Sequence, residues 1–123
     1  MPAELRAGAA YAAAMFGLGA LLGPVRELVL APRFGPTAAA ALEAVPMLIG
    51  MAILAPVLAR RFGRPAPLGM GAAGLVLLVL AESALDLAVR GHLLWAERAT
   101  TPAGWIGLGL LAAFGAMPAL RLR

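Results

Sequence analysis

Four long apolar segments dominate the chain, at residues 7–30, 36–59, 68–89 and 102–120. A helix needs about 20 predominantly apolar residues to cross the hydrocarbon core of a bilayer. The composition agrees, since 63% of the residues are hydrophobic and 13% are charged, against roughly a half and a quarter in soluble domains. We therefore predict an all-α membrane protein, with residues 1–123 forming one domain. Its fold is expected to be a four-transmembrane-helix bundle that runs up, down, up and down.

The arginines predict how this bundle is oriented. Loops with more arginine face the cytoplasm. The nine arginines outside the segments divide six to three between the two ends of the predicted bundle. The first group is Arg6, Arg60, Arg61, Arg64, Arg121 and Arg123, and the second is Arg33, Arg90 and Arg98. Both termini are therefore predicted to be cytoplasmic.

Composition also bears on the class of protein. All ten basic residues are arginine, with no lysine, which is typical of a GC-rich bacterial genome and favours a bacterial inner membrane. These arginines are dispersed, whereas nucleic-acid surfaces cluster them on one face, so no nucleic-acid partner is expected. The chain has no cysteine and one histidine, His92. We expect no metal site and no cofactor, because transition-metal sites need clusters of such ligands.

An enzymatic function is not expected either. Ser83 is the only serine, and nothing like a nucleophile elbow surrounds it. No catalytic residue is therefore assigned.

Six charged residues, five inside the predicted spans and Arg90 at the end of the third, are all expected near the outer face. At a rise of 1.5 Å per residue, they lie within the outer third of the bilayer. They are Arg26, Glu27, Glu43, Glu82, Asp86 and Arg90. Because a charge at mid-bilayer costs about 2.5–3.5 kcal/mol, we expect these side chains to face inward and form one buried charge cluster.

Spacing suggests how the cluster pairs. Glu82, Asp86 and Arg90 follow one another at intervals of four and so share a helix face, which favours an ion pair between Asp86 and Arg90. Arg26 and Glu27 point about 100° apart and are expected to find partners elsewhere. For Arg26 the candidates are Glu43 and Glu82.

Glu27 is expected to pair with Arg33 or another loop residue. Two arginines and four carboxylates leave a formal excess of two negative charges. Three outcomes remain open. Arg33 and Arg98 fold over the cluster, burial keeps one or two carboxylates protonated, or a proton or metal cation is exchanged.

Two prolines lie beside the charges. Pro24 leaves the carbonyl of Ala20 without its helical donor, and Pro46 does the same for Leu42. We predict kinked helices at both positions, with the freed carbonyls bonded by side chains or water.

Small residues are frequent in the predicted helices, including the pair Gly19 and Gly23 with GxxxG spacing. Such residues let membrane helices approach closely, so we expect a homodimer or another homo-oligomer.

Two functional hypotheses follow. The first is an accessory or assembly subunit of a larger membrane complex, in which the charge cluster fixes helix register. The alternative is a proton- or cation-coupled small transporter or channel that uses Glu43 and Glu82, with Asp86 as the entry group. The acidic cluster is also suited to recognising a lipid head group.

Overall fold

A computed structural model describes residues 2–122; Arg123, counted above among the cytoplasmic arginines, lies outside the described residues. Within that range the chain is helical and has no strand. Four helices are long and apolar enough to cross a membrane, as expected of a multi-pass membrane protein. The elements in chain order are α1 (Ala3–Val25), the π-helix η1 (Arg26–Leu30), α2 (Ala31–Phe34), α3 (Pro36–Arg61), α4 (Pro67–Arg90), α5 (Trp95–Arg98) and α6 (Pro102–Arg121).

The first helical run is longer than predicted, because helix continues through η1 and α2 to Phe34. Only Gly35 separates it from α3, with φ +88°, a backbone conformation that glycine adopts without a steric cost. Pro36 then lies in the first turn of α3, and Pro102 in that of α6, as proline's missing N–H favours. The connection over residues 91–101 contains the short helix α5.

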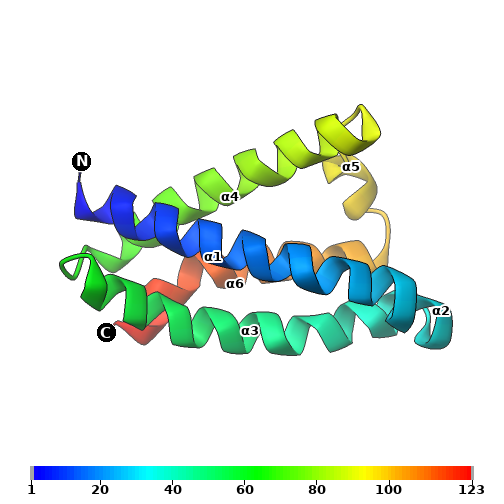
Figure 1. Cartoon of the computed structure of the whole chain (residues 1–123), viewed down its shortest axis with the longest axis horizontal. Coiled ribbons are helices and arrows are strands. Elements are labelled where there is room, and N and C mark those ends of the chain that lie inside the picture. Colours follow the sequence, from blue (N-terminus) through cyan, green and yellow to red (C-terminus); the bar gives the residue numbers. More distant parts are fainter. Residues whose placement is uncertain (1, 123) are drawn as a thin grey trace.

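Figure 1 shows both chain ends at one end of the molecule, while α2 and α5 lie at the other. We call these the terminal end and the loop end. α1 packs along α4 and α3, and α6 packs along α3 and α4. Towards the loop end α4 leans away from α1 in this view.

The core lies in the half of the bundle nearer the terminal end. The ring of Tyr11 stacks on that of Phe114 at 4.1 Å between centroids, and both side chains are fully buried. Methionine and alanine side chains from α1, α3 and α4 complete this core. Its buried members include Ala7, Met15, Met51, Ala55, Ala59 and Met70.

Glycines allow the closest approaches between helices in the same half. A Cβ at Gly71 would overlap the backbone carbonyl of Gly115, and one at Gly8 would lie 2.9 Å from backbone atoms of α4. The predicted pair Gly19 and Gly23 makes no such close approach to another helix. A Cβ at Gly23 would meet nothing within 4 Å, and one at Gly19 would make only an ordinary contact with Met47.

Two other prolines, Pro56 and Pro118, also interrupt helical hydrogen bonding. Proline has no N–H to donate four residues back, so the carbonyls of Ala52 and Phe114 lose their helical donors. The Tyr11 hydroxyl donates to the Phe114 oxygen at 2.9 Å, and Arg121 Nε donates to the Ala52 oxygen at 3.1 Å. Each carbonyl is thus bonded from a different helix.

The sequence analysis expected side-chain partners for the carbonyls beside Pro24 and Pro46. Within residues 2–122, the side-chain donors instead reach those beside Pro56 and Pro118. Pro24 is followed by η1, where the backbone N–H of Ala31 donates to the Arg26 oxygen five residues back. The kinks at Pro24 and Pro46 stay predictions.

The bond from Tyr11 predicts a measurable coupling between α1 and α6. Replacing Tyr11 with Phe keeps the stacked ring but removes the donor to the Phe114 carbonyl. We expect the free energy of unfolding in detergent to fall by about 1–2 kcal/mol, the cost of leaving a buried acceptor unbonded.

The same substitution in a Pro118→Ala background supplies the control. An alanine at this position restores an N–H that bonds the Phe114 carbonyl within α6, so Tyr11→Phe should then cost less. Equal costs in the two backgrounds would show that the proline does not create the need for Tyr11.

Candidate functional site

All six charged residues predicted to cluster line one cavity of about 640 Å³ in the half of the bundle towards the loop end. α1, η1, α3, α4 and α6 contribute to its wall, together with the loop that contains α5. A second cavity of about 450 Å³ adjoins it and shares the side chains of Arg26, Arg90 and Arg98.

The first ionic group joins η1 to α3 and α4. Arg26 Nη1 lies 3.0 Å from Glu43 Oε2, and Arg26 Nη2 lies 3.3 Å from Glu27 Oε1. The same Glu27 oxygen is 4.0 Å from Arg90 Nη2. Two arginines therefore balance two carboxylates in this group.

Glu43 is the most buried member of the first group, with a side chain 10% exposed. Its Oε2 is in ionic contact with Arg26 but accepts no hydrogen bond in the described part of the chain. The two findings are compatible, because a charge contact requires only proximity whereas a hydrogen bond also requires alignment. This oxygen keeps an unused acceptor position.

The second ionic group fastens the loop over residues 91–101 to α4. Asp86, which is 5% exposed, accepts from the backbone N–H of Leu94 at 3.2 Å and from Arg98 Nη2 at 3.3 Å. The Arg98 guanidinium also lies over the Trp95 ring, 4.3 Å from its centroid. Trp95 Nε1 donates to the Ser83 hydroxyl at 3.0 Å.

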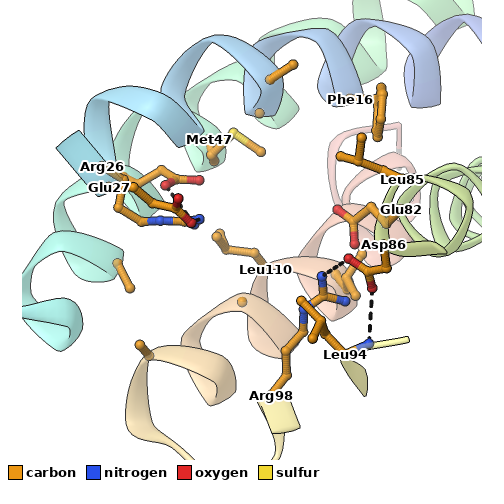
Figure 2. Close-up of a pocket in the computed structure, with 18 of the residues that line it drawn as sticks. Phe16, Arg26, Glu27, Met47, Glu82, Leu85, Asp86, Leu94, Arg98 and Leu110 are labelled. Carbon is orange, nitrogen blue, oxygen red and sulfur yellow. Dashed lines mark hydrogen bonds and ion pairs between the residues drawn. The ribbon is translucent and has the colours of Figure 1, made fainter. Parts of the chain in front are cut away.

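Glu82 lies one helical turn before Asp86 and faces the cavity between Phe16 and Arg98 (Figure 2). Among the ion pairs and hydrogen bonds of residues 2–122, none involves its carboxylate. Arg98 is the nearby positive charge; its Nη2 is bonded to Asp86, and its buried Nη1 has no hydrogen-bond partner within the described residues. Glu82 is therefore the carboxylate of the cavity that lacks a bonded partner within the described range.

The pairing differs from the sequence expectation in several places. Arg26 does contact Glu43, one of its two expected partners, but it also contacts its neighbour Glu27. Asp86 pairs with Arg98 rather than Arg90, since the loop folds back over α4.

Glu27 contacts Arg26 of η1 and Arg90 of α4, so the expected pairing with Arg33 or another loop residue is also wrong. Arg33 is exposed and does not line the cavity. Arg98 folds over the cluster and Arg33 does not, so the first of the three open outcomes is met only in part. The cavity therefore has three arginines against four carboxylates, an excess of one negative charge rather than two.

Sequence reasoning missed Trp95 as a site residue, and it named Arg98 as a residue that could fold over the cluster without assigning its partner. The loop sequence "RGHLLWAERATT" has no periodicity that fixes where it folds. One signal for these loop residues was available in the sequence. α4 has few polar groups, and Ser83 and Asp86 both need hydrogen-bond partners when they are buried. His92 is exposed, with Nδ1 3.3 Å from the Leu93 oxygen, and does not line the cavity.

Within residues 2–122, no group of three or more histidine, cysteine, aspartate or glutamate side chains is placed to hold a metal ion. Comparisons of the chain with protein families, with curated proteins and with solved structures found no match. This arrangement can bind a proton or a cation. Among the described residues that line the cavity, Glu82 has the one carboxylate without a bonded partner, and the cavity is large enough for a small molecule.

The contact between Arg26 and Glu43 predicts a non-additive effect on stability. Arg26→Met leaves the Glu43 carboxylate buried beside one fewer positive charge, and we expect the free energy of unfolding to fall by about 2 kcal/mol. This is less than the cost of breaking a fully buried pair, because the Arg26 side chain is 36% exposed. Denaturant titration in detergent measures it.

Adding Glu43→Gln to Arg26→Met should recover most of the loss, since no uncompensated carboxylate then remains at that position. Arg33→Met, at an exposed arginine, is the matched control and should change stability little. A double variant as unstable as Arg26→Met would contradict the pairing.

Proposed function

We propose that this chain is a small, non-enzymatic protein of a bacterial inner membrane that binds and carries a proton or another monovalent cation at the Glu82 carboxylate. In this proposal both termini are cytoplasmic, and the loop end with its charged cavity faces the outside. The arginine distribution supports that orientation, and the cavity lies at the end away from the termini.

The observation that carries the proposal is the charge balance of the cavity. Arg26 and Arg90 balance Glu27 and Glu43, while Arg98 balances Asp86. Glu82 remains. An uncompensated carboxylate within a membrane span costs several kcal/mol, so Glu82 is stable there when it binds a proton or a cation.

The surroundings of Glu82 favour reversible binding over a permanent structural role. Glu82 faces a cavity with space for water or a small molecule, and within residues 2–122 it makes no bond that would fix a helix. The charged groups that face it are Asp86 of α4 and Arg98 of α5. α6 presents no charged side chain between its first residue and Arg121.

This proposal changes the roles assigned from the sequence. Glu43 is held by Arg26 and is expected to set the electrostatic potential of the cavity. Asp86 anchors the loop through Leu94 and Arg98 rather than acting as a free entry group. Glu82 alone is expected to exchange its proton or cation.

Proton movement in vesicles tests the proposal. The full chain, reconstituted with an entrapped pH indicator, is expected to carry protons or to exchange them for a monovalent cation, and Glu82→Gln should reduce the rate at least tenfold. Glutamine preserves the size of the side chain but has no exchangeable charge.

Glu4→Gln is the matched control, because it makes the same change in net charge at the opposite end of the bundle. Glu4 Oε1 accepts a hydrogen bond from the Ala66 N–H, which the amide oxygen of glutamine can also accept. Equal rates for Glu82→Gln and the parent protein, or no movement in the parent, would overturn the proposal.

A second proposal is the accessory subunit of a larger membrane complex, in which the charge cluster fixes helix register. It is supported by the low burial of the four membrane-spanning helices. In an apolar stretch of 18 residues in each helix, only 6–17% is buried inside the protein. A Cβ at Gly17 or Gly109 would meet nothing within 4 Å, so small-residue faces are left for a partner helix or a second copy.

Purification in a mild detergent separates this second proposal from the first. An accessory subunit is expected to co-purify with larger membrane proteins in a fixed ratio. A chain that elutes alone or as a homodimer, and still carries protons, contradicts the accessory role.

A further inference from the structure

We propose that the cavity binds a hydrophobic organic ammonium ion, with the nitrogen at Glu82 and the apolar part against Phe16, Met47 and Leu110. This inference rests on the proposed cation site at Glu82 and specifies which class of cation the site takes. It follows from the size of the cavity, the separation of its polar and apolar walls, and its charge.

The volume of the cavity fits a small organic molecule. A proton needs no cavity, whereas about 640 Å³ lies within the usual range of roughly 300–1,000 Å³ for small-molecule sites. A bare metal ion would also leave most of this space unused. The volume of the cavity therefore favours an organic molecule over a proton or a bare metal ion.

The wall of the cavity is divided between charged and apolar parts. Figure 2 shows Arg26 and Glu27 on one side, Glu82, Asp86 and Arg98 on the other, and Met47 and Leu110 between them. Deeper towards the core the lining is apolar and includes Met15, Met51, Leu78 and Leu111. A ligand that fits both parts is amphipathic.

Methionines make this apolar part adaptable. Their unbranched, polarizable side chains fit ligands of irregular shape, and Met15, Met47 and Met51 all line the cavity. Phe16 also lines the cavity, with Leu85 between it and Glu82 in the view of Figure 2, and offers an aromatic ring to the apolar part of the ligand.

The net charge of the cavity lining predicts that the polar group of the ligand is positive. The lining carries one more carboxylate than arginine, so an anion would add to an existing excess of negative charge. Within residues 2–122, the oxygens of the Glu82 carboxylate take part in no ion pair or hydrogen bond. An ammonium group supplies N–H donors for such oxygens as well as the missing positive charge.

Three probes that share one hydrocarbon skeleton test the sign of the ligand. They are 4-phenylbutylammonium, the neutral 4-phenylbutanol and the anionic 5-phenylpentanoate. Binding to the full chain in detergent is followed by the fluorescence of Trp95, which lines the cavity, in a Trp105→Phe background. The ammonium probe is expected to bind at least tenfold more tightly than either of the others, and Glu82→Gln should remove this preference.

Two glycines of α6 provide a matched pair of variants that test the position of the ligand. A Cβ at Gly107 or at Gly109 meets nothing within 4 Å, so a side chain can begin at either position without a clash at Cβ. Gly107 lines the cavity and Gly109 does not. Gly107→Leu should therefore weaken binding of the ammonium probe at least tenfold, while Gly109→Leu should leave it unchanged.

The outcomes separate this inference from the proposed function. Equal binding of the three probes, tighter binding of the carboxylate, or equal effects of the two leucine variants would overturn the organic-cation site. If no probe binds but proton movement still depends on Glu82, this inference fails and the proposed function stands. Loss of both results would overturn both.

Discussion

The structure depends on the cost of an ionised side chain in a medium that cannot solvate it. Arg26, Arg90 and Arg98 each contact a carboxylate, and together they neutralise three of the four carboxylates in the cavity. Because these contacts join η1, α3, α4 and the loop over residues 91–101, the ionic groups also connect the helices where apolar packing is sparse. Glu82 is left over, and its position next to an open space makes it the expected site of exchange.

The two halves of the bundle are packed differently. Near the terminal end, Gly8, Gly71 and Gly74 allow close backbone contact, and the stacked rings of Tyr11 and Phe114 fill the core. Tyr11 also bonds a carbonyl that Pro118 leaves free. Towards the loop end this dense packing gives way to a cavity. A densely packed half thus supports the half that contains the cavity.

Much of the architecture could be predicted from the sequence, because length and hydropathy alone define a membrane helix. The number of helices, the first-turn positions of Pro36 and Pro102, and the identity of the six clustered charges came from such local signals. Helix ends were less accurate. The run to Phe34 was missed because "APRFGP" contains an arginine, a glycine and two prolines, which favour a loop, although Pro32 and Arg33 both lie in α2.

The pairing of charges could not be predicted in full, because it depends on how a loop without periodicity folds. Helical spacing favours Arg90 as the partner of Asp86, but the backbone N–H of Leu94 brings Arg98 to it instead. The hydrogen bonds to the Ala52 and Phe114 carbonyls depend on which helices are neighbours. Such contacts between residues far apart in the chain leave no pattern in one sequence.

Infrared spectroscopy of the reconstituted protein tests the central claim most directly, because the C=O stretch of a protonated carboxyl group is distinct from that of a carboxylate. At a pH where exposed carboxylates are ionised, we predict one protonated carboxyl band that is absent in Glu82→Gln and weakens when 4-phenylbutylammonium binds. A spectrum without such a band, or a band that Glu82→Gln leaves unchanged, would contradict the account.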